Sequence, residues 1–380
     1  MRARCDGEKS QDDKRPKAPM HQQSTRADSK RPSGYRPCSS FSVSPTSSKM
    51  TLHVPESNEA NQVVLPVNNS HRTFYLPNVG EILGQGSTSL VAKIKPGTVI
   101  KSPRYSWWDC GVAELHHFVT DVKYSFEVEE QLLNKLGTHP RIVRYIINPG
   151  PLIQHTMLNI LSSYLGPSID PRGLLFEEAS DGNLKAYIDQ HNDSIDLHLR
   201  LKWCRQAAEA IHYIHQKGVM HSDLRPENFL LHSKSDSKLD LLLCDFGGSM
   251  CGDIDGVCKP DSGFFDPCKP LVSTEAVDIF NLGSIFYLVM TGRWPCKIPR
   301  SFETSDENME YGQLVNGLSA SQKYPDHDGH SLPGGAVIQR CWTGRYSNLE
   351  ELIRDQNLLF SEIEHGDIQG TMDKKRQGTN

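Results

Sequence analysis

Residues 276–290 constrain the fold more than any other part of the chain, because apolar side chains lie on nearly every side of this segment when it is drawn as a helix. A helix of this kind is buried all round, either in the core of a large protein or in a membrane. The apolar run around it, residues 271–290, contains Glu275 and Asp278, so we do not expect it to span a membrane. The segment therefore predicts a globular domain with a large core, in which this helix ends at Thr291-Gly292.

The two ends of the chain have a composition that disfavours folding. The chain has 380 residues, and its first 50 hold eleven Lys and Arg, five Asp and Glu, ten Ser and few aliphatic residues. Such a segment cannot bury enough apolar surface to offset the entropy of ordering it. We therefore expect residues 1–70 to form a disordered, basic tail rich in Ser and Pro, and residues 366–380 to form a second polar tail.

Net charge and cysteine spacing narrow the class of protein. The formal net charge of −5 argues against a dedicated nucleic-acid binder, which would carry a basic excess. The N-terminus leads into charged residues, so we expect no signal peptide, and none of the ten cysteines forms a Cys-x-x-Cys pair. We expect an intracellular protein, cytoplasmic or nuclear, in which Cys251, Cys258 and Cys268 are free thiols rather than metal ligands.

Strand and helix patterns along the middle of the chain predict two lobes. A turn at Pro96-Gly97 separates two apolar runs and predicts a hairpin. Most strand patterns precede the helix patterns, which favours a small, β-rich lobe joined to a larger, mainly helical lobe, an α+β fold. The expected strands are residues 90–94, 98–101, 174–176 and 241–244, and the expected helices are residues 126–136, 197–216 and 276–290.

Two features of the first strands are suited to binding phosphate groups. Gly84 and Gly86 lie in a turn where the absence of side chains lets the backbone approach phosphates closely, although such glycines also occur in ordinary hairpins. Lys101 follows Val99 by two residues and so lies on the same face of the next strand. As a cation it could reach phosphate oxygens, or it could be a charge at the rim of the sheet.

Two later motifs place a base and oxygen ligands in loops. Asp223 and Asn228 are five residues apart in the segment that follows the helix expected over residues 197–216. Asp223 could accept a proton from an attacking hydroxyl group, and Asn228 could bind a hard cation through its carbonyl oxygen. Asp245 leaves an apolar strand, where a carboxylate needs a partner such as a metal. Each of these motifs alone is also typical of a capped turn.

Taken in order, these motifs resemble those of the eukaryotic protein kinase family. Residues 129–143, 176–179, 278–283 and 341–342 also match segments of the family. The resemblance spans residues 77–360 and implies a bilobal fold, with an N-lobe over residues 77–178 and a C-lobe over residues 179–360. The motifs that carry it are Gly84-x-Gly86-x-x-Ser89-x-Val91, Val99-Ile100-Lys101, His221-Ser222-Asp223-x-x-x-x-Asn228 and Asp245-Phe246-Gly247.

The resemblance implies an ATP- and Mg²⁺-dependent protein kinase, and it implies a role for each matched residue. The acceptor would be a Ser or Thr hydroxyl group of a protein whose identity the resemblance does not give. Glu129 would be the ion-pair partner of Lys101, with Glu130 as the alternative. By role, the implied site residues are Gly84, Gly86, Val91, Glu177 and Ala179 around ATP, Lys101 on its α- and β-phosphates, Asp223 as catalytic base, and Asn228 and Asp245 as magnesium ligands.

Three departures from the family pattern bear on regulation and activity. Ser222 replaces an arginine that in the family often pairs with a phosphorylated activation segment, so we do not expect that switch here. Arg225 replaces the lysine usual in serine/threonine kinases, although Pro226-Glu227 follows their style. The Ala-Pro-Glu motif is not evident, and residues 262–267 occupy its place. The usual brace between its glutamate and an arginine, here Arg345, therefore lacks the glutamate.

We expect two insertions relative to the pattern of the family. The insertions are residues 102–123, with Trp107-Trp108, and residues 148–172. The tryptophan pair predicts either a partner surface or a cluster that caps the lobe, and the N-terminal tail is a second candidate partner surface.

Two other functions are also compatible with the sequence. The missing Ala-Pro-Glu favours a pseudokinase that binds nucleotide or acts as a scaffold. The small Ser222 favours a small-molecule kinase of the aminoglycoside phosphotransferase type.

Overall fold

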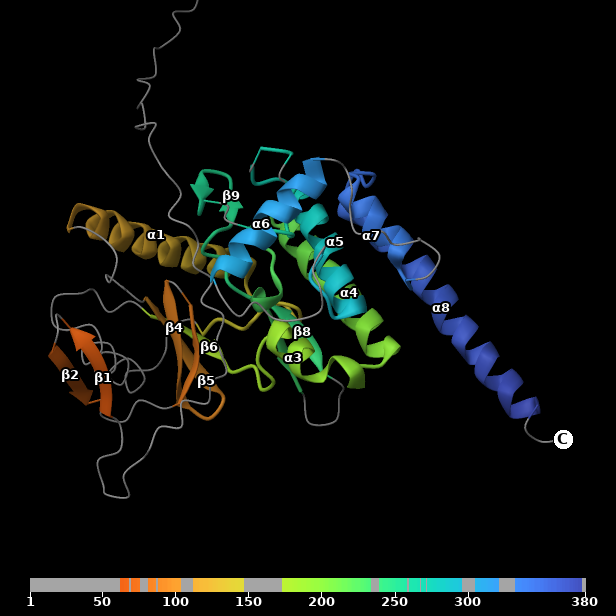
Figure 1. Cartoon of the computed structure of the whole chain (residues 1–380), viewed down its shortest axis with the longest axis horizontal. Coiled ribbons are helices and arrows are strands. Elements are labelled where there is room, and N and C mark those ends of the chain that lie inside the picture. The colour runs from red at the N-terminus through yellow and green to blue at the C-terminus, as the bar shows by residue number, and fades with distance from the viewer. Residues whose placement is uncertain are drawn as a thin grey trace, which may run out of the picture. The chain divides into compact units, whose positions relative to one another are not determined.

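The computed structural model describes part of the chain, within the compact unit Phe41–Asn380 (Figure 1). The Trp107-Trp108 pair, the whole of the second expected insertion and most of the N-terminal tail lie outside the described residues. The described residues are 62–67, 70–75, 81–86, 88–103, 112–146, 173–233, 239–257, 260–266, 268–270, 272–295, 305–320 and 332–377.

The small lobe contains a four-stranded antiparallel sheet. Its strands, in both chain order and sheet order, are β3 (Ile82–Gln85), β4 (Ser89–Lys95), β5 (Thr98–Pro103) and β6 (Leu174–Glu177). β4 and β5 form the predicted hairpin around Gly97, whose φ of +78° favours a residue without a Cβ atom. In this register Lys101 on β5 lies opposite Val91 on β4 and Leu174 on β6.

Helix α1 (Val112–Leu136) begins well before residue 126, where apolar spacing placed its start. Residues 112–123 therefore belong to this helix and not to the expected insertion. Phe118, Val122 and Phe126 follow one another at four-residue spacing and pack against the core, with Val122 and Phe126 buried. These three residues extend the apolar face of the helix towards its N-terminus. The polar residues between them make this apolar spacing difficult to recognise in the sequence.

A two-stranded hairpin, β1 (Gln62–Val67) and β2 (Ser70–Tyr75), precedes β3 in the chain. β1 lies within the last residues of the segment expected to be disordered. Its sequence, QVVLPV, is richer in β-branched and aliphatic residues than the first 50 residues, which explains why a strand forms there.

The large lobe is mainly helical, with two short antiparallel hairpins. Its helices are α3 (Leu184–His191), α4 (Leu197–Gln216), α5 (Glu275–Thr291), α6 (Ser305–Ala320), α7 (Gly335–Trp342) and α8 (Leu349–Gln377). Its hairpins pair β7 (Phe229–His232) with β8 (Asp240–Leu243) and β9 (Met250–Cys251) with β10 (Ile254–Asp255). The division into a β-rich lobe and a helical lobe confirms the predicted α+β fold.

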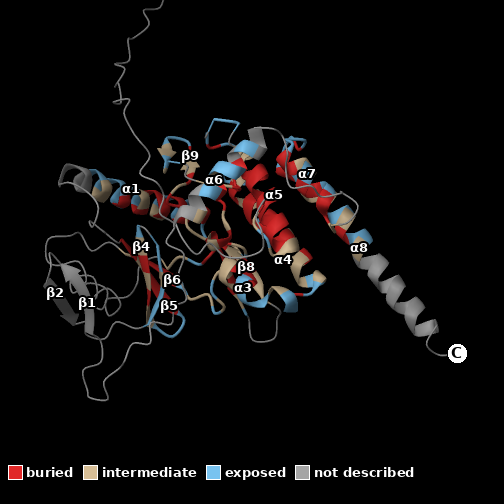
Figure 2. Ribbon diagram, viewed as in Figure 1, coloured by how far each residue is buried: buried red, intermediate tan, exposed pale blue. Residues whose placement is uncertain are grey.

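Helix α5 is buried along nearly its whole length, as its apolar composition predicted (Figure 2). Helices α4 and α7 pack against it. A Cβ atom on Gly283 would lie 2.7 Å from the Cβ atom of Cys341 in α7, so glycine is what lets these two helices approach so closely. The helix ends at Gly292, with φ +70°, which confirms the end predicted from the Thr291-Gly292 pair.

Helix α4 has the bounds that the sequence predicted. Asp196 caps its N-terminus by accepting a hydrogen bond from Leu199 N at 2.7 Å. Arg200 ties this helix to two other helix ends, because its guanidinium donates to Val289 O of α5 and, at 2.6 Å, to Asn192 O after α3. These bonds satisfy carbonyl groups that the ends of helices leave unpaired.

Helix α8 runs to Gln377, so most of the residues expected to form a polar C-terminal tail are helical. Its first half packs against α4 and α7, with Leu352 and Phe360 buried. Among the described residues, none of the helices combines the length and the hydropathy needed to cross a bilayer.

Candidate active site

Lys101 on β5 forms ion pairs with two carboxylates from different elements. Its Nζ atom lies 2.7 Å from Glu129 Oε2 on α1 and 2.9 Å from Asp245 Oδ1, just after β8. The partner on α1 is therefore Glu129 and not the alternative, Glu130, which accepts a hydrogen bond from Tyr145 at 3.0 Å. The contact joins a sheet and a helix of the small lobe to a loop of the large lobe.

Burial and charge act in opposite directions on this triad. Burial alone would lower the pKa of Lys101, but Asp245 and Glu129 outweigh it and raise that pKa above its ordinary value. Burial would raise the pKa of Asp245, whereas Lys101 lowers it to about 2. Burial also raises the pKa of Glu129, an effect that Lys101 only partly offsets. The lysine is therefore a cation and Asp245 an anion at neutral pH.

The loop that carries Asp223 is anchored to the core by Asp278 on α5. The Asp278 side chain has no exposed surface. Its Oδ2 atom accepts hydrogen bonds from His221 N and His215 Nε2, both at 2.8 Å, and its Oδ1 atom accepts one from Ser222 N at 2.8 Å. These bonds fix the backbone immediately before Asp223 to helix α5.

Two residues of the site have left-handed backbone conformations. Ser222 has φ +64° and is fully buried, and Asp245 has φ +65°. Such values are uncommon for residues other than glycine, although Asp adopts them more readily than most. Ser222 therefore occupies a tight backbone turn, where its short side chain offers no charge to a phosphorylated segment.

The β7–β8 hairpin brings Asn228 and Asp245 together. Asn228 immediately precedes β7, and its backbone oxygen accepts a hydrogen bond at 2.9 Å from the N–H of Cys244, which follows β8. The Nδ2 atom of Asn228 donates to Asp223 O at 2.7 Å. The amide nitrogen is thus engaged with the loop, and the amide oxygen lies on the other side of the group.

Asn228 and Asp245 form a donor set that fits magnesium. Asn228 supplies an amide oxygen, and the Asp245 carboxylate keeps 41% of its side-chain surface exposed beside its contact with Lys101. Mg²⁺ binds few protein oxygens and completes its shell with water and substrate phosphates. Within the described residues, no group of three or more His, Cys, Asp or Glu could hold a metal by itself. A magnesium ion here would therefore take further ligands from a nucleotide.

Asp223 has one carboxylate oxygen engaged and one available. Its Oδ2 atom accepts a hydrogen bond from Arg225 Nη2 at 3.1 Å, whereas its buried Oδ1 atom has no partner in the part of the chain that the structure describes. Burial raises the pKa of Asp223 to about 7, and Arg225 only partly opposes this rise. A carboxylate with an unused acceptor and a pKa near neutrality is suited to general-base chemistry.

Gly84 and Gly86 lie where β3 turns towards β4. Gly86 N donates to Ser89 O at 2.8 Å, and neither glycine has a positive φ. A Cβ atom on Gly84 would meet no other atom within 4 Å. Neither packing nor backbone conformation therefore requires glycine at this position, and close approach of a ligand is the reason that the sequence suggested.

Residues 177–179 begin at the last residue of β6 and connect the two lobes. Glu178 accepts hydrogen bonds from Lys93 Nζ at 2.6 Å and from Gly97 N at 3.0 Å, so it is held by the β4–β5 hairpin. The bond from Lys93 lowers the pKa of Glu178. Among the described residues, the N–H of Ala179 has no hydrogen-bond partner. A free N–H suits the adenine contact expected of Ala179, and the roles of Ala179 and Glu177 stay predictions.

The segment in place of Ala-Pro-Glu is anchored in the core by contacts of its own. Phe264 is fully buried and meets Trp294 edge to face, with ring centroids 5.0 Å apart. Ser284 Oγ on α5 donates to Gly263 O at 2.7 Å, and Trp342 Nε1 donates to Ser284 Oγ at 3.0 Å. These contacts hold the segment without a glutamate–arginine brace.

Sequence reasoning missed most of this anchor. Arg345, the candidate for the brace, is exposed and has no ion-pair partner in the described part of the chain. The signal for Phe264 was the Phe264-Phe265 pair within a polar segment. Ser284 carried no signal, because a serine in an apolar helix usually bonds to its own backbone.

The cysteines expected to be free thiols are free where the structure describes them. Cys251 and Cys268 form no disulfide, and Cys258 lies outside the described residues. The Sγ atom of Cys251 accepts a hydrogen bond from Lys135 Nζ at 2.9 Å.

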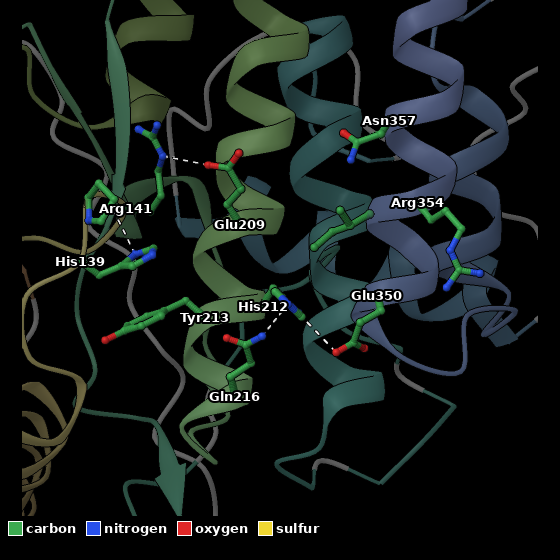
Figure 3. Close-up of a pocket in the computed structure, with 11 residues that line it drawn as sticks. His139, Arg141, Glu209, His212, Tyr213, Gln216, Glu350, Arg354 and Asn357 are labelled. Atoms are coloured by element: carbon green, nitrogen blue, oxygen red, sulfur yellow. Dashed lines mark hydrogen bonds and ion pairs between the residues drawn. The ribbon is translucent and has the colours of Figure 1, made fainter.

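A cavity of about 620 Å³ lies away from these residues, between α4, α8 and the loop after α1 (Figure 3). Most of its charged side chains already have partners: Arg141 pairs with Glu209 at 3.0 Å, and His212 lies 3.8 Å from Glu350. None of the site residues predicted from the sequence lines it. The cavity is therefore not part of the candidate active site.

Comparison with known proteins identifies the family. The family model described as protein kinase domain matches residues 78–348, well over half of the chain. The chain therefore belongs to the protein kinase family, which confirms the family expected from the motifs. Membership implies, in general, the use of ATP and a divalent metal.

Three curated relatives show how distant the similarity is. Calcium/calmodulin-dependent protein kinase type 1 of Macrobrachium nipponense is 34% identical over 119 residues, which cover 30% of this chain and 32% of the relative. Probable serine/threonine-protein kinase gdt8 of Dictyostelium discoideum is 26% identical over 214 residues, 54% of this chain and 15% of the relative. Aurora kinase A-A of Xenopus laevis is 28% identical over 166 residues, 39% of this chain and 38% of the relative. The matches therefore span well under half of each relative.

Proposed function

We propose that this chain is an active protein kinase that transfers the γ-phosphoryl group of ATP, with Mg²⁺, to Ser and Thr hydroxyl groups of proteins. The observation that carries the proposal is the pairing of Lys101 with both Glu129 and Asp245. This triad joins the two lobes in the arrangement that phosphoryl transfer by this family needs.

Each residue of the site has a task that its surroundings support. Lys101, held by Glu129, is a cation ready for the α- and β-phosphates. The free Oδ1 atom of Asp223 accepts the proton of the acceptor hydroxyl group. Asn228 and Asp245 hold magnesium, which when bound neutralises charge on the phosphates. Positioning and charge neutralisation are most of what this reaction requires of a protein.

The type of acceptor is supported by two independent features. Curated relatives include proteins named serine/threonine kinases, and Pro226-Glu227 follows the pattern of that group. The match to a protein kinase domain favours a protein acceptor over the small molecule of an aminoglycoside-type enzyme. An intracellular setting and the partner surfaces at the N-terminal tail and Trp107-Trp108 stay predictions from the sequence.

A pseudokinase is the second candidate function, because the brace of Arg345 has lost its glutamate. The burial of Phe264 and its contact with Trp294 weigh against this alternative, since they anchor the same segment by other means. ATP binding without transfer would distinguish a pseudokinase from an active enzyme.

The test is Mg²⁺-dependent transfer of labelled γ-phosphate from ATP to a mixed protein substrate by the full chain. We expect label with the unmodified chain, none with Asp223→Asn, and an unchanged amount with Asp193→Asn, which alters an exposed carboxylate. Phosphoamino-acid analysis of the product reports Ser and Thr against Tyr. Equal labelling by Asp223→Asn would contradict the assigned base, and absence of label with retained ATP binding would favour the pseudokinase.

A further inference from the structure

Arg225 joins the candidate base to the segment between Asp245-Phe246-Gly247 and α5, which we call the activation segment. Its Nη2 atom lies 3.1 Å from Asp223 Oδ2, and its Nη1 atom lies 3.0 Å from Asp261 Oδ2. The three side chains are largely buried, with 29%, 13% and 17% of their surface exposed for Arg225, Asp223 and Asp261. A guanidinium group has donors in a fixed planar fork, so it holds both carboxylates in a defined geometry.

Asp261 is itself fixed to the core. Its backbone oxygen accepts a hydrogen bond from Phe264 N at 3.0 Å, which closes a tight turn. Phe264 is buried against Trp294, and another backbone oxygen of the turn, that of Gly263, accepts a hydrogen bond from Ser284 of α5. The carboxylate of Asp261 is therefore presented to Arg225 from a rigid support.

The buried guanidinium group of Arg225 is stabilised by more than one carboxylate. Burial alone would lower the pKa of Arg225, but Asp223 and Asp261 outweigh it, and Glu227 and Asp245 add to their effect. Without Asp261, one side of the guanidinium fork would lose its acceptor, and Arg225 would be free to turn away from Asp223. An exposed ion pair contributes little, but a largely buried pair that loses one partner is costly.

We propose that Asp261 is a positioning residue that, through Arg225, holds the Asp223 carboxylate in place and orders the activation segment with a permanent negative charge. The proposal rests on the function proposed above. It also accounts for Ser222: where the segment is ordered by an aspartate of the chain, an arginine that would receive a phosphate is not needed.

The test compares Asp261→Asn, Asp261→Glu and Asp253→Asn in the full chain. Asp253 is an exposed carboxylate in the β9–β10 turn of the same segment and serves as the matched control. We expect Asp261→Asn to lower kcat about 10- to 100-fold, because the variant loses one charge-assisted hydrogen bond. The KM for ATP should change less than about twofold. Asp261→Glu should recover part of kcat, and Asp253→Asn should match the unmodified chain.

Three results would overturn the proposal. An unchanged kcat in Asp261→Asn would show that Asp261 does not position the base. A fall in kcat with an equal rise in KM for ATP and a lower melting temperature, not relieved by Asp261→Glu, would show a merely structural role. Loss of activity after phosphatase treatment of the unmodified chain would contradict the permanent ordering of the segment.

Hydrogen exchange separates this proposal from the proposed function. Amide exchange over residues 260–266 should be at least about tenfold faster in Asp261→Asn than in Asp253→Asn, because the segment loses its tie to Arg225. A chain that transfers no phosphate but shows this difference would refute the kinase activity and support the tie. Equal exchange in the two variants would refute the tie whatever the activity.

Discussion

Asp278 has no exposed surface and serves three hydrogen-bond donors, two of them backbone N–H groups of His221 and Ser222. We expect Asp278→Ala to lower the free energy of unfolding by about 3–5 kcal/mol, because the donors are left unsatisfied in the core. Urea denaturation measures the loss, with the exposed Asp193→Ala as control. A loss below about 1 kcal/mol would contradict the anchoring role.

Asn281, one turn further along α5, is a buried polar side chain whose hydrogen-bonding groups, unlike those of Asp278, are not satisfied by any described residue. It has no exposed surface, and within the described residues neither atom of its amide group has a hydrogen-bond partner. A buried unsatisfied amide costs about 1–3 kcal/mol, so the near-isosteric Asn281→Leu should raise the free energy of unfolding by about 1 kcal/mol. A lower melting temperature in this variant would mean that the amide has a partner such as a buried water.

At the scale of elements, helices α5 and α7 approach each other closely at Gly283. A Cβ atom on Gly283 would lie 2.7 Å from Cys341 Cβ and 3.2 Å from Trp342 Cδ1. We expect Gly283→Ala to destabilise the chain by at least about 1–3 kcal/mol, because the helices must move apart. Gly317→Ala in α6 is the matched control, since nothing lies within 4 Å of the added atom, and alanine should there be neutral or stabilising. Equal effects would show that the contact is not restrictive.

The elements also show what sequence patterns could and could not predict. The bounds of α4 and the end of α5 followed from apolar spacing and from a glycine after each helix, and Glu129 followed from helical register. The early start of α1 was missed because Phe118 and Val122 lie among polar residues. The Arg225–Asp261 pair was missed because it depends on how a segment without a regular pattern folds against the loop that carries Asp223, which only tertiary packing determines.

At the scale of the whole molecule, nucleotide binding should stabilise the fold. Mg²⁺-ATP at about 100 times its Kd adds about 2.7 kcal/mol to the free energy of unfolding, so the melting temperature should rise. Asp223→Ala should keep this rise, because the base does not hold the nucleotide, and Lys101→Met should reduce it. A rise that is the same in Lys101→Met as in the unmodified chain would contradict the placement of the phosphates beside Lys101.

The anchoring of the catalytic loop in the core also has an evolutionary consequence. In the proposed function Asp223 accepts the proton of the acceptor, whereas Asp278 holds the loop from inside the protein. A descendant of this chain that no longer needs to transfer phosphate can lose the first aspartate by one substitution and still fold. It cannot lose the second so easily, so in such a lineage the buried aspartate would outlast the base. A folded descendant would then say little about whether it remains an enzyme.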